Sequence, residues 1–239
     1  MLLGDSMKKI IIIALVLIVI FLSIYIINFK VDKTVISVNA TAITSKVVVI
    51  DAGHGKPDEG AVGLYGTTEE AINLKIAMKL QALVEQSGGI VYLTRSNENG
   101  IYSSQAKSIR EKKISDVKNR VIIGNGQDVD IFISIHLNKY PSSTYSGWQT
   151  FYQQGNEESI RLAKCVQDSL NNTISKPNNR VPLVLKGVYL MDHIQNTTIT
   201  VECGFLSNPK EEQLLLNETY QRKMAWAIHL GILQYLNEK

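Results

Sequence analysis

Residues 47–60 read VVVIDAGHGKPDEG, a run that joins an apolar strand to a polar, glycine-rich loop. The first four residues are β-branched and apolar, which is typical of a strand covered on both faces. His54 follows between Gly53 and Gly55, so an imidazole comes almost directly after the end of this strand. Open α/β sheets bind their ligands beyond the carboxyl ends of their strands. The stretch therefore predicts an α/β fold with a functional histidine at one edge of its sheet.

Apolar segments of two kinds alternate along the rest of the chain. The expected strands are residues 47–51, 90–95, 129–138, 147–153, 187–192 and 198–205. The expected helices lie within residues 69–88, 112–127, 158–174 and 209–236. The second is expected to end near Gly124, and the last segment holds one helix or two. Strands that alternate with helices and read as continuous apolar runs indicate a parallel arrangement. The sequence thus predicts a single α/β domain with a mostly parallel, twisted sheet flanked by helices.

The N-terminal region differs from this pattern. Residues 10–27 are almost entirely apolar, and at a helical rise of 1.5 Å per residue they would extend about 27 Å, close to the thickness of a bilayer core. We expect residues 1–29 to be a signal anchor, with a cleaved signal peptide as the alternative, although the apolar part of a signal peptide is usually only about 7 to 15 residues long. Residues 30–45 read as a linker and residues 46–239 as the folded domain, which in either case would lie on the outer side of the cytoplasmic membrane.

Charge and cysteine content exclude some functions. The net charge is +3, and residues 1–30 carry three lysines and one aspartate, which leaves about +1 for the remainder. So weak a charge argues against a nucleic-acid partner. The two cysteines, Cys165 and Cys203, are expected as free thiols in the interior, because two residues cannot establish a disulfide.

Four chemically reactive side chains are expected at one edge of the sheet. His54 follows the first strand, His136 ends the third, Glu202 lies near the end of the last, and Glu69 begins the helix after the His54 loop. A catalytic zinc ion commonly takes three protein ligands and leaves one position open. A further carboxylate, not on the metal, can then move the proton of the attacking water. The set therefore suits a hydrolytic zinc site.

Each of these residues also has a purely structural interpretation. His54 also fits a turn histidine. Its glycine-rich loop resembles an anion cradle as well, but the loop lacks both G-x-x-x-x-G-K-[ST] and G-x-G-x-x-G. His136 fits equally a hydrogen-bonded core histidine, Glu69 a carboxylate that stabilises a helix N-terminus, and Glu202 a solvated residue at a strand end. Of the other histidines, His193 is expected at the surface or the substrate rim and His229 inside a helix.

Six stretches occur in order between Lys46 and the C-terminus: VVVIDAGHGKPDEGAVG, GTTEEAINLKIA, LTR, NRVIIGN, DIFISIHLN and TVECGFLSNPKEEQLL. As an ordered set they resemble the zinc-dependent N-acetylmuramoyl-L-alanine amidases of the type 3 class. That family cleaves the amide between the lactyl group of muramic acid and the L-Ala of the peptidoglycan stem peptide. The resemblance implies Zn2+ ligands at His54, Glu69 and His136, and a catalytic glutamate at Glu202.

The resemblance also concerns residues around the site. It matches Arg95 and Arg120 to family arginines, either as substrate contacts or as structural residues, and it makes Asn138 a candidate substrate-binding residue in the cleft. The chain departs from the family over residues 96–115, which are longer and more polar than the usual link after the LTR motif.

Within the family, an anchor joined directly to a bare catalytic domain looks most like the spore-cortex amidase, which takes part in forming the muramic-δ-lactam. This implies peptidoglycan as substrate, a role in sporulation or germination, a location in the spore intermembrane or cortex space, and coupling to a muramic acid deacetylase. One alternative is another zinc peptidase of the cell wall, such as a carboxypeptidase. A second is a membrane-tethered, non-catalytic peptidoglycan-binding protein. A third keeps the enzyme but makes its metal occupancy depend on an activating protein partner.

Overall fold

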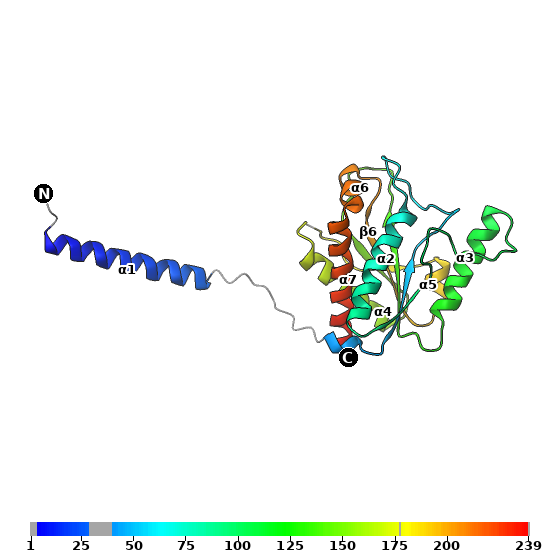
Figure 1. Ribbon diagram of the computed structural model, residues 1–239, viewed down its shortest axis with the longest axis horizontal. Coiled ribbons are helices and arrows are strands. Elements are labelled where there is room, and N and C mark those ends of the chain that lie inside the picture. The colour runs from blue at the N-terminus through cyan, green and yellow to red at the C-terminus, as the bar shows by residue number, and fades with distance from the viewer. Residues whose placement is uncertain (1–3, 29–39, 177, 239) are drawn as a thin grey trace. The chain divides into compact units, whose positions relative to one another are not determined.

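The computed structural model describes residues 4–28, 40–176 and 178–238 (Figure 1). The chain divides into two compact units, Met1–Ser37 and Val38–Lys239.

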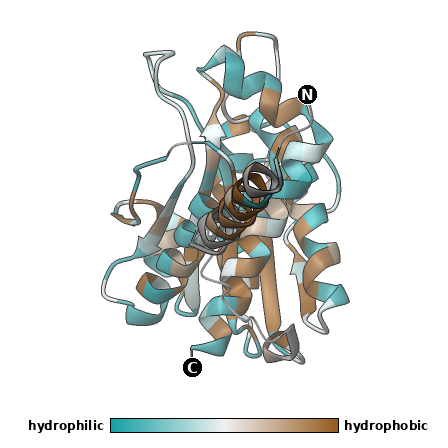
Figure 2. Ribbon diagram, turned by 90° about the vertical axis from the view of Figure 1, so that its left-hand side faces the viewer, coloured by the Kyte–Doolittle hydropathy of each residue, from teal (hydrophilic) through white to brown (hydrophobic). Residues whose placement is uncertain are grey.

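The first unit consists of helix α1 (Asp5–Asn28). Its large apolar side chains between Ile10 and Phe21 are exposed, and its ribbon carries the brown of hydrophobic residues in Figure 2. Among the residues that the structure describes, no helix is both long and apolar enough to cross a membrane. The structure therefore does not confirm the anchor expected over residues 1–29, which stays a prediction.

The second unit contains one sheet and its covering helices. The strands are β1 (Val47–Ala52), β2 (Ile90–Leu93), β3 (Ile131–Asn138), β4 (Gln149–Gln153), β5 (Leu183–Leu185) and β6 (Thr197–Phe205). The helices are η1 (Ala40–Ile43), α2 (Glu69–Gln86), α3 (Ile109–Gly124), α4 (Glu157–Thr173), α5 (Tyr189–His193), α6 (Pro209–Leu216) and α7 (Glu218–Asn237). The break between α6 and α7 falls at Asn217, whose side chain accepts hydrogen bonds from the first turn of α7.

The sheet is six-stranded, with the order β2-β1-β3-β6-β4-β5. All neighbouring strands run parallel except β4 and β6, which pair antiparallel. The prediction of a mostly parallel sheet flanked by helices is thus confirmed. Because β1, β3 and β6 are adjacent and parallel, their carboxyl ends lie side by side at one edge of the sheet.

Two hydrophobic cores lie on opposite faces of this sheet. Alternate strand residues such as Val48, Ile50 and Ile133 belong to the larger core, which the sheet shares with α2, α4 and α7 (Figure 1). The intervening residues Val49 and Phe132 belong to a smaller core. The rest of that core is Leu190, Met191 and Ile194, from α5 and the position after it. One face of the sheet is therefore packed much more extensively than the other.

The structure corrects two predictions. Residues 187–192 were expected as a strand, but Tyr189–His193 form the short helix α5. Leu190, Met191 and Ile194 are buried, a spacing of one and four residues that fits one face of a helix and breaks the alternation of a half-buried strand. The last six residues of the expected linker, 40–45, also belong to the domain, because η1 places Ile43 in the larger core with no exposed surface. The linker residues before position 40 lie outside the described residues.

Both cysteines are buried and free, as expected. Burial raises the pKa of each thiol, that of Cys165 to about 12, so neither is a nucleophile near neutral pH.

Candidate functional site

Three potential metal ligands converge at the carboxyl edge of the sheet. His54 Nε2 lies 3.2 Å from Glu69 Oε2, and His136 Nδ1 lies 2.9 Å from Glu69 Oε1. One ligand atom from each of the three residues lies within 4.8 Å of the other two. Two imidazole nitrogens and one carboxylate form a set that zinc commonly takes in hydrolases, so the donor chemistry fits a zinc ion. The structure thus brings together the three residues expected as ligands.

The backbone positions each ligand for a definite reason. His136 lies near the end of β3, between Ile135 and Leu137 of the larger core. Glu69 is the first residue of α2 and is 4% exposed, and its two carboxylate oxygens accept hydrogen bonds from the backbone N–H groups of Ala61 (2.8 Å) and Leu137 (3.0 Å). Burial alone would raise the pKa of Glu69, but the hydrogen bonds and charges of His136 and His54 outweigh it and hold this pKa well below its usual range.

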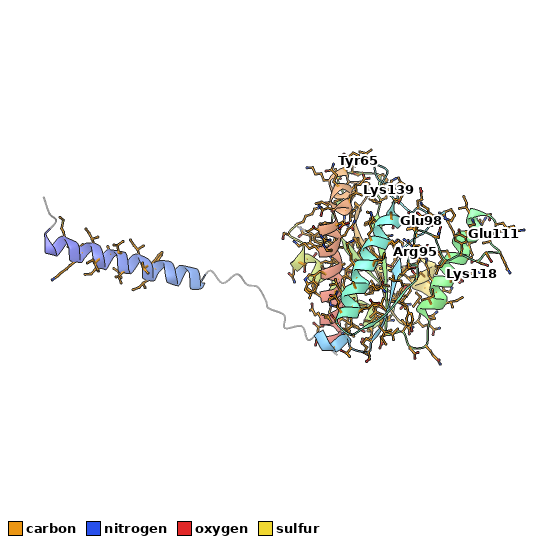
Figure 3. All side chains as sticks on the ribbon, in the orientation of Figure 1. Tyr65, Arg95, Glu98, Glu111, Lys118 and Lys139 are labelled. Carbon is orange, nitrogen blue, oxygen red and sulfur yellow. The ribbon has the colours of Figure 1, made fainter. Side chains whose placement is uncertain are left out.

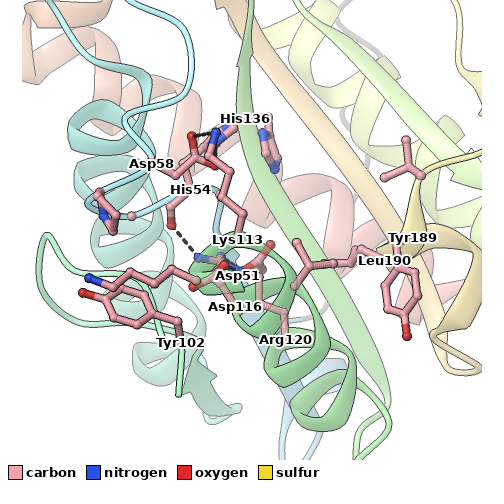
Figure 4. A pocket seen from close by; sticks show the side chains of 16 residues that line it. Asp51, His54, Asp58, Tyr102, Lys113, Asp116, Arg120, His136, Tyr189 and Leu190 are labelled. Atoms are coloured by element: carbon pink, nitrogen blue, oxygen red, sulfur yellow. Dashed lines mark hydrogen bonds and ion pairs between the residues drawn. The ribbon is translucent and has the colours of Figure 1, made fainter. Parts of the chain in front are cut away.

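His54 lies in a strained loop conformation. Its φ of 62° lies in the left-handed region, which a non-glycine residue adopts only when its surroundings hold it there. Asp58 supplies one such contact, because its Oδ2 lies 3.1 Å from His54 Nδ1, while Lys113 lies 2.8 Å from its other oxygen (Figure 4). Although burial disfavours the charged imidazole, the bonds to Asp58 and Glu69 raise the pKa of His54 to about 9. Asp58 therefore orients the ring so that Nε2 faces the site.

Two glycines make room for the ligands. A Cβ at Gly53 would lie 2.3 Å from His136 Nε2, and a Cβ at Gly60 would lie 2.6 Å from Glu69 Oε2. No side chain other than hydrogen fits at either place without displacing a ligand. The glycines of the opening stretch thus serve the approach of the ligands as well as the turning of the loop.

Glu202 lies next to this group on β6. The register of β3 and β6 pairs His136 with Glu202, so both side chains lie on the same face near the same edge. The Oε2 atom of Glu202 is shielded from solvent and has no hydrogen-bond partner among the described residues. Burial raises the pKa of Glu202 to about 7, and the negative charge of Glu69 adds to this effect. The charges of His136 and His54 lower the pKa, but by less. A carboxyl group with this pKa can both accept and donate a proton near neutral pH.

A buried network of ion pairs and hydrogen bonds holds the loop that carries His54. Arg120 bonds Asp51 and Asp116, and it also donates to the carbonyl oxygens of Ala52 and His54. Burial alone would raise the pKa of Asp51. The charge of Arg120 and the hydroxyl groups of Ser134 and Thr94 outweigh this effect and hold the pKa below its usual range. The network fixes the end of β1 and the start of the loop to α3.

The two candidate substrate contacts lie in different surroundings. Arg95 is 4% exposed and donates to the carbonyl oxygens of Ala52, Gly53 and Glu70, inside the domain (Figure 3). These contacts favour a structural role for Arg95 over a role as a substrate contact. Asn138 is half-buried at the end of β3, where its carbonyl accepts a hydrogen bond from Leu206 N–H. Its role as a substrate contact stays a prediction.

A pocket of about 210 Å³ opens beside His54 and His136. Figure 4 shows Tyr102 on one side of the site and Tyr189 with Leu190 on the other. Tyr102 belongs to the long segment 96–115, and the other two belong to α5. Neither wall was predicted from the sequence. Asp58 was not predicted either, although its position four residues after His54 in the same short loop was a signal that could have identified it.

The two remaining histidines lie away from the ligand group. His193 is exposed, and its Nδ1 lies 2.8 Å from the carbonyl oxygen of Tyr189. His229 is 2% exposed within α7, and its Nε2 lies 3.0 Å from the hydroxyl of Ser87. His229 therefore lies inside a helix, as expected.

Comparisons with known proteins agree with this geometry. The family model Amidase_3, N-acetylmuramoyl-L-alanine amidase, matches residues 48–234. The germination-specific N-acetylmuramoyl-L-alanine amidase of Bacillus subtilis (strain 168) is 34% identical over 197 residues, which are 82% of this chain and 82% of that protein. The solved CwlD amidase from Clostridioides difficile, in complex with the GerS lipoprotein, is 42% identical with a TM-score of 0.79, covering 82% of this chain and 100% of that one. An N-acetylmuramoyl-L-alanine amidase from Clostridium difficile 630 gives a TM-score of 0.71 at 31% identity, over 82% and 99% of the two chains.

The matched region begins in β1 and ends in α7, so it includes the His54, Glu69 and His136 group and Glu202. It contains both walls of the pocket as well. The chain therefore belongs to the N-acetylmuramoyl-L-alanine amidase family and is a hydrolase of that family.

Proposed function

We propose that the chain uses a zinc ion held by His54, Glu69 and His136 to hydrolyse the amide between the muramic acid lactyl group and L-Ala. The observation that supports this most directly is the three-residue donor group beside a shielded carboxyl group, in a chain of this family. A zinc ion in such a site supplies Lewis acidity and lowers the pKa of water.

Glu202 is proposed as the group that carries the proton. Its pKa of about 7 leaves a substantial fraction ionised at neutral pH, and this fraction accepts the proton of the attacking water. The protonated carboxyl then donates to the nitrogen of the departing L-Ala. No described group donates a hydrogen bond to its Oε2, so no described residue competes for the proton that this carboxyl would carry.

The Glu202→Gln variant tests this role. It keeps the shape of the side chain and the three proposed ligands, but it cannot accept a proton. We expect zinc binding close to that of the unchanged protein and a fall in kcat of about 10² to 10⁴-fold. Equal turnover by the variant and the unchanged protein would contradict the assignment.

The test of the reaction is a product analysis. The purified chain is assayed for bound zinc and incubated with purified peptidoglycan, and the products are identified by mass spectrometry and by their new amino termini. Stem peptides that begin with L-Ala support the amidase. Loss of C-terminal residues from intact stems would indicate a carboxypeptidase instead. Binding of peptidoglycan with no cleavage, after zinc has been added back, would indicate a non-catalytic wall-binding protein.

We propose a role in maturation of the spore cortex. The similarity to the germination-specific amidase of Bacillus subtilis supports this role. It implies a product that a muramic acid deacetylase then converts to the δ-lactam. The test is a deletion strain, whose spore peptidoglycan should lack the lactam and should regain it with the unchanged gene but not with the Glu202→Gln gene.

Location and partners follow as further proposals. The apolar residues 10–27 support attachment to, or secretion across, the cytoplasmic membrane with the domain on its outer side. The test is fractionation of cells, followed by protease treatment from outside.

The complex of the CwlD amidase with the GerS lipoprotein supports a protein partner for this chain too. Full zinc content and activity of the purified chain alone would refute a requirement for such a partner.

A further inference from the structure

The pocket beside the proposed metal ligands contains one cation that no described carboxylate balances. Of the basic residues that line it, Lys113 lies 2.8 Å from Asp58 and Arg120 is shared by two buried aspartates. Lys112 lines the same pocket, and within the described parts of the chain it has no carboxylate within ion-pair distance. The pocket thus offers a positive charge for a ligand.

An aromatic ring holds this cation in place without neutralising it. The Nζ atom of Lys112 lies 4.8 Å from the centroid of the Tyr102 ring. Attraction between an ammonium group and the face of a ring restrains the side chain and leaves its full charge. Both residues are half-buried, so they are partly desolvated and still reachable from the pocket.

The segment that carries Tyr102 is fixed to the loop of the site. The N–H of Lys56 donates to the Glu98 carbonyl (2.8 Å), and the N–H of Gly100 donates back to Lys56 (3.0 Å). The N–H of Ile101 donates to Asp116 Oδ1 at 2.6 Å. These bonds make residues 98–101 a firm support for the wall, which lies in the stretch where this chain departs from the family pattern.

The substrate of the proposed reaction places negative charge on one side only of the scissile bond. The lactyl group and the uncharged sugars lie on the acyl side. On the amine side, L-Ala is followed by a glutamate that is linked through its side chain, so its α-carboxylate is free. The glutamate is the residue next to L-Ala, so their Cα atoms lie about 3.8 Å apart.

We infer that Lys112, held by Tyr102, is a specificity-determining residue that binds the free α-carboxylate of the second stem residue. The inference rests on the proposed function and assigns a direction to the cleft: the stem peptide lies toward α3. A charge-assisted bond of this kind discriminates against an uncharged isostere, because the ammonium group then loses its partner.

The test compares two synthetic muramyl tripeptides that differ at one group. In one, the glutamate α-carboxylate is free, and in the other it is a primary amide. We expect the unchanged protein to show a kcat/KM about tenfold higher for the acid. Lys112→Met should lose this preference by lowering kcat/KM for the acid only, and Lys112→Arg should retain most of it. Lys75→Met, on the exposed face of α2, is the matched control and should behave as the unchanged protein.

Salt provides an independent measurement. The preference for the acid should shrink as the ionic strength rises, and Lys112→Met should show no such dependence. Equal kcat/KM for the two tripeptides, or a preference that survives in Lys112→Met, would overturn the subsite and leave the amidase intact. Failure of the unchanged, zinc-loaded protein to release stem peptides from whole peptidoglycan would instead refute the proposed function, and this inference with it.

Discussion

Substitution of Gly53 by alanine should abolish tight metal binding without unfolding the domain. The added Cβ would lie 2.3 Å from Nε2 of His136, so the ring would have to retreat by about 1 Å to reach an ordinary contact of roughly 3.5 Å. The loop itself cannot move away easily. Its Gly53 carbonyl accepts bonds from Arg95 (3.0 Å) and Asn73 (3.2 Å), and its N–H donates to Ile135 (3.0 Å).

A ligand shifted by this distance is lost to the metal, because zinc bonds tolerate only about 0.2 Å. We therefore expect the zinc affinity of Gly53→Ala to fall by at least about 100-fold, as measured by competition with a chromophoric chelator. Gly155→Ala is the matched control, since its φ of 74° gives backbone strain but no atom lies within 4 Å of its added Cβ. The control should lose about 1 kcal/mol of stability and keep its zinc affinity. Zinc affinity in Gly53→Ala within threefold of the unchanged protein would refute the steric argument.

Three further substitutions test the surroundings of the site and the core. Asp58→Asn should lower zinc affinity about 10- to 100-fold, because the asparagine orients His54 less firmly, and chelator competition measures this. Arg120→Met should lower the unfolding free energy by about 3 to 5 kcal/mol in urea titrations, because Asp51 stays buried without its cation, and adding Asp51→Asn should recover part of the loss. Burial lowers the pKa of His229 from 6.5 to about 4, so the folded state resists protonation and its stability falls as the pH drops from 6.5 to 4. His229→Gln should remove about 3 kcal/mol of this fall from the curve of unfolding free energy against pH, and identical curves would count against it.

The strands and helices were predictable where hydrophobic periodicity is strong. The run before Asp51 is continuously apolar, and the run before His136 is interrupted only by Ser134, so both are typical of buried strands. The carboxyl ends of adjacent parallel strands lie at one edge of the sheet. For this reason the geometry of the sheet brings His54, His136 and Glu202 together across more than a hundred residues of sequence. The choice of Glu69 over its neighbour Glu70 came from the resemblance and agrees with the ligand group that the structure shows.

Other features depend on tertiary contacts that a linear pattern does not record. The segment 187–192 is apolar enough to be predicted as a strand. In the structure its buried residues pack against one face of the sheet, and Tyr189–His193 form helix α5. The spacing of Asp58 from His54 marks it as a candidate, but the contact between them also depends on the left-handed turn at His54, which the spacing does not specify. Tyr102 and Lys112 meet only because residues 98–101 bond to the loop after β1.

The two faces of the sheet differ in how many apolar side chains they bury, so they should also differ in local stability. The extensive core beneath α2, α4 and α7 maintains the fold. Among the described residues, the core on the other face is smaller: it consists of Val49, Phe132 and three residues around α5, with four partly buried hydrophobic residues packed against it. Elements with few buried apolar contacts open at lower free energy than the rest of a domain. Backbone amides on the side of the smaller core should therefore exchange their hydrogens faster than those of the strands and helices around the larger core.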